Sequence, residues 1–448
     1  MLEKFDKFRI FKKVEFQTET PTEAHLEASD NVPPVTEVFT ESETARRITE
    51  AGEYCEKKTQ DFADFADALT ATPEETACAR YLRDELSDVA PAKLEAFKTS
   101  PYAGRNCCLL LALVYFVALL FYMCSFAGSP VSGIVLAVFA LLILLGGGFV
   151  AGAMFLGARK FVKILPKKIS YNVVSSRCPS GDPIKERTLI VATNHDASAG
   201  AFLRDFDLVR KVVFVTVPVS VVLFLMFCAI RLGVGTDGVT KATSLTVIPF
   251  VTSMAGIIAL AIHFSPMQRH ARENNNAGTA VALALYRYFV SAPGVLPEGT
   301  TVYFVSFGGE NSAHAGSRAF AAAHPEIKGA KAIVIGDIQS SNFKLIHKDS
   351  LRGTVYSQTA SRAALAAADK HNVSCSLAES DDFKSKLNSL HGYSASALAE
   401  AGCDCAMFVA KDYTEKGHTP DKEDMSRLFA LALGTAVNMM EEKNAKQG

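Results

Sequence analysis

The sequence predicts an α/β fold in which a mostly parallel, helix-flanked sheet is interrupted by two transmembrane helical hairpins. Strand patterns rich in β-branched residues alternate with helical patterns along the chain, which favours parallel strands joined by helices. Four apolar stretches interrupt this alternation in two pairs, and each has close to the ~20 residues that cross a bilayer. The stretches are Asn106–Phe126, Val131–Leu156, Val212–Leu232 and Leu245–Phe264.

The chain before the first apolar pair divides into a tail and two helices. Residues 1–43 are predicted to be a disordered tail, because Gln17–Glu43 is rich in Thr, Glu and Pro and poor in large apolar residues. The N-terminus is charged and lacks an apolar core with a cleavage site, so we expect no secretory signal peptide. Helical spacing over Thr44–Leu69 and Thr72–Val89 predicts two helices of the soluble domain within 44–100.

The strands and helices that follow make up the rest of the soluble domain. Strands are predicted over Ile169–Ser175, Thr188–Thr193, Thr300–Phe307, Ala332–Ile338 and Cys405–Ala410. Helices are predicted over Asn276–Val290, Ser317–Ala323, Ser394–Ala401 and Lys422–Glu441. The soluble domain is therefore expected to comprise 44–100, 169–205 and 269–448, with hairpins over 106–156 and 212–264 inserted in it.

Charge and cysteine content limit the location and the partners. Basic residues gather at one side of both hairpins: Arg105, Arg159, Lys160, Lys163, Lys167, Lys168, Arg204, Arg210, Lys211, Arg269 and Arg272. This asymmetry predicts a multi-pass protein of the cell membrane with both termini and the soluble domain in the cytoplasm. A net charge of −1 gives no reason to expect a nucleic-acid partner. The absence of a CxxC pair agrees with a reducing compartment.

Five motifs at predicted strand ends and loops carry the functional argument. They are Asn194-His195-Asp196, Asn274-Asn275-Asn276-Ala277-Gly278, Glu310-Asn311 with Gly316-Ser317-Arg318 behind it, Gly336-Asp337, and Gly417-His418-Thr419-Pro420-Asp421. This order resembles the M28 family of zinc aminopeptidases, and in particular membrane-anchored bacterial members with inserted hairpins. The family's motifs run H-x-D, N-D-N-A-S-G, E-E, a strand-end Asp, and H-T-x-x-D. The resemblance implies a phosphorylase/hydrolase-like fold.

For an active member, the resemblance implies two zinc ions bridged by a carboxylate and a water that the metals ionise. Carried over to this chain, three of the five ligand positions hold asparagine. The H-x-D histidine corresponds to Asn194, the bridging aspartate to Asn275, and the second glutamate of E-E to Asn311. A neutral amide is a poorer zinc ligand than a carboxylate or an imidazole. A tight dinuclear site is therefore not expected.

The remaining site residues are retained. Asp337 and His418 correspond to the two other ligands. Glu310 corresponds to the general base and Asp196 to the carboxylate that orients the histidine. His195 would replace the lost histidine only if a bulge turned it toward the site, because neighbouring side chains of a strand point to opposite faces.

The sequence leaves three functions open. The first is an M28-like membrane protein that is catalytically impaired or inactive and binds a peptide, a protein partner or nothing. The second is an active membrane-bound metallo-aminopeptidase that releases N-terminal residues and uses zinc, the one cofactor that the motifs indicate. The third is a transporter or channel subunit, which the lack of acidic residues within the spans disfavours. The bilayer is the expected partner of the hairpins, and the sequence does not indicate an oligomeric state.

Overall fold

The computed structural model describes residues that belong to one compact unit, Glu37–Gly448. The described residues are 41–101, 103–127, 129–155, 166–184, 186–201, 207–233, 244–263, 269–292, 294–312, 314–349, 354–378, 393–410 and 420–445. The predicted tail over 1–43 therefore lies outside them, apart from its last three residues, which already belong to α1.

An eight-stranded mixed sheet forms the centre of the soluble domain, in the order β1-β2-β6-β3-β7-β10-β8-β9. Its strands are β1 (Ala92–Thr99), β2 (Lys168–Arg177), β3 (Thr188–Asn194), β6 (Thr301–Phe307), β7 (Lys331–Ile338), β8 (Phe343–Ile346), β9 (Cys375–Leu377) and β10 (Asp404–Ala410). The four central strands β6, β3, β7 and β10 are parallel. β1, β2 and β8 pair antiparallel with their inner neighbours, and β9 is parallel to β8. The predicted α/β sheet is confirmed, with a parallel centre.

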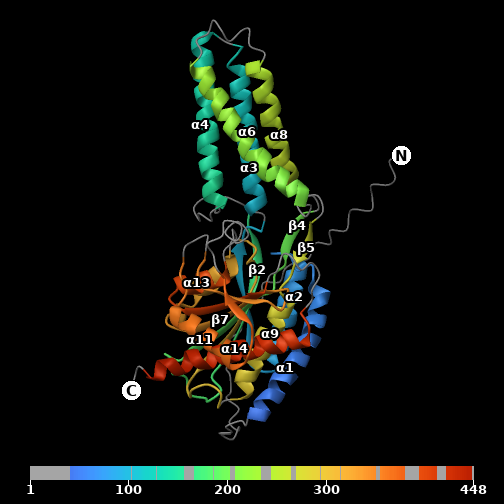
Figure 1. Cartoon of the computed structure of the whole chain (residues 1–448), viewed down its shortest axis with the longest axis vertical. Coiled ribbons are helices and arrows are strands. Elements are labelled where there is room, and N and C mark those ends of the chain that lie inside the picture. Colours follow the sequence, from blue (N-terminus) through green and yellow to red (C-terminus); the bar gives the residue numbers. More distant parts are fainter. Residues whose placement is uncertain are drawn as a thin grey trace, which may run out of the picture. The chain divides into compact units, whose positions relative to one another are not determined.

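Helices cover both faces of this sheet (Figure 1). One face packs against α1 (Glu41–Asp61), α2 (Pro73–Ser87), α9 (Asn276–Ser291), α11 (Gln358–Lys370) and α14 (Lys422–Ala445). The other packs against α10 (Ala315–Ala323) and α13 (Ser394–Glu400). Two short 3-10 helices span Phe62–Phe65 and Pro325–Ile327.

The two apolar layers follow from the alternation of side chains along each central strand. In β3, Leu189 and Val191 join the core under α9, whereas Ile190 and Ala192 join the core under α10 and α13. All four are fully buried. Burying one such large aliphatic side chain stabilises the fold by about 1.5–3 kcal/mol. The strand is thus apolar from Leu189 to Ala192, and polar side chains follow at Thr193 and Asn194.

All four predicted apolar stretches form helices: α3 (Ala103–Cys124), α4 (Pro130–Phe155), α6 (Asp207–Gly233) and α8 (Ser244–His263). They pack as a bundle, in which α3 contacts α4 and α8, and α6 contacts α8 and α4. Among the described residues, two segments are long and apolar enough to cross a membrane, Val131–Val150 and Lys211–Gly233, each with a mean hydropathy of 2.7. The apolar helices over Leu109–Cys124 and Leu245–Ala261 are shorter.

Buried aromatic side chains pack the bundle, and one of them bonds a carbonyl that a proline leaves without a helical partner. Tyr115, Tyr122 and Phe224 are fully buried between the helices. Pro249 lies inside α8 and has no N–H, so the carbonyl of Leu245 loses its partner within the helix. The hydroxyl of Tyr122 donates to that carbonyl at 2.8 Å and so ties α3 to α8.

Each hairpin is inserted between two strands that pair with one another. β1 and β2, which flank the first hairpin, pair antiparallel from Ala92↔Ser175 to Thr99↔Lys168. The second hairpin is flanked by β4 (Ser198–Ala201) and β5 (Arg269–Glu273), which form a separate antiparallel ribbon. In both cases the ribbon returns the chain to the place from which it left, so the sheet continues across the insertion.

Candidate functional site

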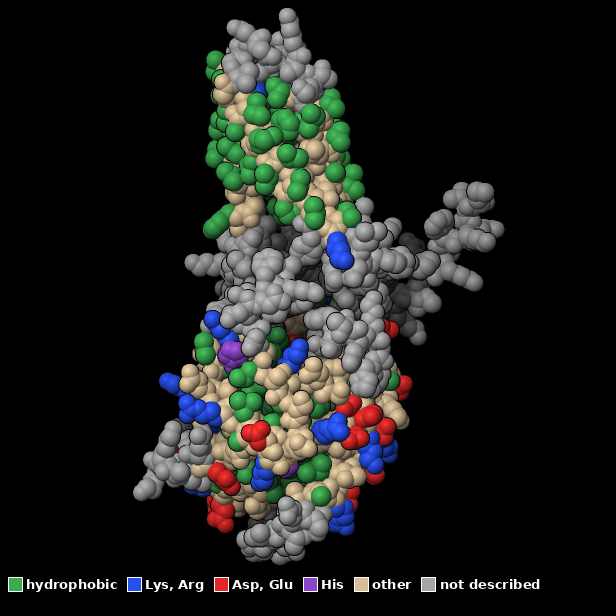
Figure 2. Space-filling model, in the orientation of Figure 1, with side chains coloured by type: hydrophobic (Ala, Val, Ile, Leu, Met, Phe, Trp, Pro, Cys, Tyr) green, Lys and Arg blue, Asp and Glu red, His purple; other side chains and the backbone are tan. Residues whose placement is uncertain are grey.

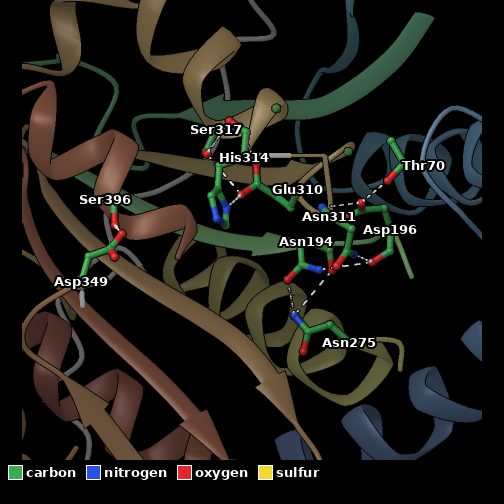
Figure 3. A network of polar contacts seen from close by, with 12 residues as sticks. Thr70, Asn194, Asp196, Asn275, Glu310, Asn311, His314, Ser317, Asp349 and Ser396 are labelled. Atoms are coloured by element: carbon green, nitrogen blue, oxygen red, sulfur yellow. Dashed lines mark hydrogen bonds and ion pairs between the residues drawn. The ribbon is translucent and has the colours of Figure 1, made fainter. Parts of the chain in front are cut away.

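Five of the polar residues that the sequence singled out lie close together where central strands end (Figure 3): Asn194, Asp196, Asn275, Glu310 and Asn311. β3 ends at Asn194, and β6 leads into the turn that carries Glu310 and Asn311. Gly309 precedes Glu310 with a φ of 60°, a conformation that glycine adopts at little cost. Asn275 is the N-cap of α9 and lies against the same strand ends. Parallel strands place their carboxyl ends at one edge, which explains why the motifs converge.

The amide of Asn275 is the centre of a hydrogen-bonded network. It is 2 % exposed, and its Nδ2 donates to Thr193 Oγ1 (3.0 Å), Asn194 Oδ1 (3.0 Å) and the Ile335 carbonyl (3.1 Å). The Ile335 carbonyl can only accept, so the NH2 end of this amide must face it. The residue expected at the family's bridging position thus presents its NH2 group to the strand ends. The network joins β3, β7 and α9.

Asp196 anchors the second part of the site. Its Oδ2 accepts from Thr70 Oγ1 (2.7 Å) and from the backbone N–H of Asn311 (3.0 Å). Its carbonyl accepts from the amides of Asn194 (3.3 Å) and Asn311 (3.2 Å). Burial raises the pKa of Asp196 to about 6, against the hydrogen bonds from Asn311 and Thr70, which lower it. Asn194 and Asn311 are thereby held on Asp196 by their NH2 groups.

Glu310 is held by the start of α10. Its Oε1 accepts from the backbone N–H of Ser317 at 2.7 Å, and its Oε2 lies 2.9 Å from His314 Nδ1 and accepts from Ser317 Oγ at 3.2 Å. The Glu310 side chain is 5 % exposed. The carboxylate expected to correspond to the general base therefore contacts three groups of its own loop and helix.

His195 lies beside this network and is bonded to another strand. Its Nδ1 is 2.9 Å from Ser306 Oγ on β6, and its backbone N–H donates to the Phe307 carbonyl at 3.1 Å. Burial lowers the pKa of His195 to about 4, so the imidazole is neutral at pH 7. Its role as a replacement ligand stays a prediction, and the contact with Ser306 gives the imidazole a structural partner.

Of the two residues expected to be retained ligands, Asp337 is described and His418 is not. Asp337 is the penultimate residue of β7 and is half-buried. His418 lies outside the described residues. Among the described residues there is no group of three or more His, Cys, Asp and Glu that could hold a metal ion.

One family model matches part of this chain. Residues 273–433 match the family model of Peptidase family M28, a range that includes Asn275, Glu310, Asn311, Asp337 and His418. The resemblance to peptidase family M28 is confirmed over these residues. No curated protein matches the chain.

Some solved structures are similar to this chain at low sequence identity. A glutaminyl cyclase from Fimbriiglobus ruber is 13 % identical to this chain, with a TM-score of 0.44. The match covers 86 % of this chain and 95 % of the cyclase. A zinc aminopeptidase from Bacillus subtilis is 12 % identical, with coverages of 87 % and 94 % and a TM-score of 0.43. An aminopeptidase from Aneurinibacillus sp. strain AM-1 is 12 % identical, with coverages of 88 % and 95 % and a TM-score of 0.44.

The described side chains of the M28-like domain do not fit two zinc ions. The NH2 groups of Asn194, Asn275 and Asn311 all donate to protein oxygens. An amide could face a metal only through its oxygen, such as Asn275 Oδ1, which is buried without a partner among the described residues. That oxygen is neutral, and so a poorer zinc ligand than a carboxylate or an imidazole. Glu310 is occupied by Ser317 and His314. The NH2 groups of the three asparagines are thus bonded to protein oxygens, and none of the three side chains carries a charge for a divalent cation.

One buried carboxylate of the site was not anticipated from the sequence. Glu75, near the start of α2, is 1 % exposed and accepts from the N–H groups of Gly309 (2.9 Å) and Ala71 (2.6 Å) and from Ser170 Oγ (2.9 Å). Burial and the charge of Asp196 raise its pKa to about 8. The helical spacing over Thr72–Val89 predicted a helix here, and gave no sign that Glu75 holds the turn before Glu310.

Proposed function

We propose that this chain is a multi-pass membrane protein whose M28-like domain has lost dinuclear zinc and peptide hydrolysis, and whose strand-end site serves to bind a peptide or a protein partner. The observation that carries the proposal is the Asn275 amide, which donates to three protein oxygens where the family places a bridging carboxylate. An amide cannot give the negative charge that two divalent cations would share.

The loss of metal would remove the chemistry of hydrolysis. Bulk water has a pKa of about 15.7, and zinc lowers it to about 7 in hydrolytic sites. Glu310 alone has no acidic water to deprotonate, and its carboxylate already accepts from Ser317 and contacts His314. The site keeps its fold and its position at the strand ends, where α/β domains bind ligands.

Metal content tests this proposal directly. The full chain is purified in detergent and measured by elemental mass spectrometry beside an Asp337→Ala/His418→Ala variant, which removes the two retained ligand positions. We expect no zinc above that control. Near-stoichiometric zinc that disappears in the control would contradict the proposal.

A reversion adds a gain of function to the same test. The triple variant Asn194→His/Asn275→Asp/Asn311→Glu restores the family's ligand types at the three substituted positions. We expect this variant to bind zinc that the wild-type chain does not bind. Asn438→Asp serves as a control for a general effect of added charge, because Asn438 donates to the Ala363 carbonyl away from the site.

The membrane part of the proposal is supported by the surface of the bundle. Figure 2 shows apolar side chains over the bundle. Large residues with more than a third of their surface exposed occur on all four helices, among them Leu113, Leu142, Phe149, Val215, Val222 and Val251. A patch of this extent in water would be an association or aggregation site, whereas in hydrocarbon it is the expected surface. Resistance to extraction by alkaline carbonate tests membrane insertion.

The cytoplasmic location of the sheet domain is tested by thiol labelling. Cys178 is a partly exposed thiol of this domain. A membrane-impermeant maleimide should label Cys178 only after the cells are permeabilised, with Cys178→Ser as the reference for labelling elsewhere. Labelling of Cys178 in intact cells would place the domain outside.

An active metallo-aminopeptidase is the second candidate, because Glu310, Asp196 and Asp337 are all retained. It requires turnover of aminoacyl substrates in the presence of added zinc, manganese or cobalt, and a loss of that turnover in Glu310→Gln. Absence of turnover under all three conditions would leave the binding function.

A further inference from the structure

Both hairpins leave the sheet at the edge that holds the candidate site. β1 is antiparallel to β2 and β2 is antiparallel to β6, so β1 runs in the same direction as β6. Thr99, the last residue of β1 before the first hairpin, therefore lies at the carboxyl edge of β6. The chain to the second hairpin leaves β3 at Asn194, which pairs with Phe307, the last residue of β6. The chain thus enters both hairpins from the carboxyl ends of central and outer strands.

A hydrogen bond joins the site to the start of the first hairpin. Ser312, two residues after Glu310, donates from its Oγ to the Ser100 carbonyl at 2.6 Å. Ser100 follows β1 directly, and α3 begins three residues later at Ala103. Three residues of chain span at most about 11 Å. The loop that carries Glu310 is therefore held close to the point where the chain enters α3.

In a membrane-inserted bundle, the hydrocarbon begins a short distance beyond this point. The apolar segment of α3 begins at Leu109, six residues after Ala103. Six residues of helix rise about 9 Å. Ser100 therefore lies within about 20 Å of Leu109, a distance that an extended peptide of about six residues spans. A segment next to a transmembrane helix of another protein is long enough to reach the site from the bilayer.

Carboxylates gather at the centre of the same edge. Glu75, Asp196 and Glu310 are buried there, and Asp337 is half-buried near the end of β7. Burial and the negative charge of Asp196 raise the pKa of Glu75, so these two carboxylates lie close together. Groups of one charge sign in a protein cleft raise the local concentration of ligands of the opposite sign. The centre of the edge therefore favours a positively charged ligand.

Exposed lysines lie at the outer part of this edge. Lys167 and Lys168 are both exposed at the start of β2, where Lys168 pairs with Thr99. Lysines beside a membrane helix on the cytoplasmic side are attracted to anionic lipid head groups. The outer part of the edge therefore suits the membrane surface, whereas its acidic centre suits a basic ligand.

We propose that the ligand of the strand-end site is a Lys- and Arg-rich segment that flanks a transmembrane helix of another membrane protein. Binding of such a segment rests on the proposed function, both on peptide binding at the site and on a cytoplasmic sheet domain. Cytoplasmic segments beside membrane helices carry an excess of Lys and Arg, which the carboxylates of the site attract. Anchoring of both proteins in one bilayer raises the effective concentration of the segment at the site.

The test measures photo-cross-linking of synthetic peptides to the full chain in vesicles of phosphatidylcholine, whose head groups carry no net charge and so do not hold a basic segment. The first probe is a transmembrane helix of Leu and Ala followed by a short segment of Lys and Arg that carries a photoreactive group. In the second probe, Ser and Gln replace the Lys and Arg. The third probe is the basic segment without the helix. Cross-linking yield against probe concentration gives the half-saturating concentration of each probe.

We expect the anchored basic probe to reach half-saturation at a concentration about 10-fold or more below that of either other probe. Mass spectrometry should place its cross-links within residues 308–317 of the wild-type chain, a readout that needs no variant. Glu310→Gln and Asp337→Asn should each raise its half-saturating concentration about 10-fold or more, since each removes a charge from the site. Glu298→Gln is the matched control, because it removes an exposed carboxylate before β6, at the opposite edge of the sheet.

Three results would overturn the proposal in different ways. Equal half-saturating concentrations of the soluble and the anchored basic probe, with cross-links within 308–317, would exclude presentation from the membrane and leave peptide binding at the site intact. Equal binding of the basic and the neutral anchored probe would exclude recognition of charge. Cross-links only outside 308–317 would exclude the site as the place of binding. The zinc content of the purified chain tests the loss of metal separately from all three.

Discussion

The substitution Asn275→Asp tests whether hydrogen bonds have replaced metal coordination. It restores the family's bridging carboxylate and changes the side chain by one group. Asn275 is 2 % exposed, and its NH2 group faces Thr193 Oγ1, Asn194 Oδ1 and the Ile335 carbonyl. An ionised aspartate would direct a negative oxygen at the same three oxygens.

The expected loss of stability follows from these contacts. Leaving one buried acceptor unsatisfied costs about 1–3 kcal/mol. The Ile335 carbonyl cannot adapt, whereas the Thr193 hydroxyl can turn to donate and the Asn194 amide can turn its NH2 toward the new carboxylate. The N-terminus of α9 favours a negative charge by about 0.3–1 kcal/mol. We therefore expect a net loss of about 2–4 kcal/mol at pH 7.

The pH dependence gives a second signature. The buried aspartate should have a folded pKa above its unfolded value of about 3.9. A raised pKa on an acid means that the loss of stability is absent below pH ~4 and grows as pH rises toward the folded pKa. Below pH ~4 the protonated carboxyl can also donate one hydrogen bond.

The assay is urea unfolding of the full chain in detergent, followed by circular dichroism, with and without zinc. Asn276→Asp is the matched control, because the neighbouring Asn276 donates a single hydrogen bond, to the Phe62 carbonyl at 3.1 Å. That variant should lose about 1 kcal/mol or less. Wild-type stability of Asn275→Asp at pH 7 without metal would refute the reasoning. Full recovery on adding zinc would show that a metal site survives.

Three further predictions concern other parts of the chain. Hydrogen bonding to Glu95 raises the pKa of His324. The stability that this contact gives should therefore be complete below the unfolded pKa of about 6.5 and be lost as pH rises through the folded pKa. The difference in unfolding free energy between wild type and His324→Gln, measured from pH 5 to pH 9, checks this. Tyr122→Phe should lower the free energy of unfolding by about 0.6–1.7 kcal/mol in the wild-type background. The loss should be smaller in Pro249→Ala, because the Leu245 carbonyl regains its helical partner there. A double-mutant cycle of thermal unfolding measures the coupling. Glu310→Gln should destabilise the domain by about 1–3 kcal/mol, because its carboxylate holds the start of α10; an unchanged urea midpoint would contradict that structural role.

The sequence predicted the parts of the fold that have strong local patterns. The buried strands of the sheet centre and helices such as Asn276–Ser291 were found close to their observed bounds, because apolar periodicity determines them. Ala92–Thr99 was not predicted as a strand, since it is a half-exposed edge strand whose partner lies beyond the first hairpin. The alanine-rich helix Gln358–Lys370 and the short strands Phe343–Ile346 and Cys375–Leu377 were also missed.

For the candidate site, the sequence indicated the residues at strand ends but not the contacts made by distant segments. Strand ends placed Asn194, Glu310 and Asn275 together, because parallel strands share one edge. The parts that depend on distant packing were not found. Thr70 reaches the site from the turn before α2, and Glu75 reaches it from α2 itself. Ser306, on a neighbouring strand, contacts the imidazole of His195. No local pattern reports such contacts.

The second hairpin, which lies between β4 and β5, separates two residues of the candidate site in the order of synthesis. Asn194 is made before the 67 residues from 202 to 268, and Asn275 is made after them. At about 5–20 residues per second, the ribosome needs roughly 3–13 s for this stretch. Throughout that interval the end of β3 lacks its partner from α9, and the hydrogen bond between Asn275 and Asn194 can form only afterwards. The speed with which the second hairpin is translated therefore sets how long the nascent domain stays incomplete.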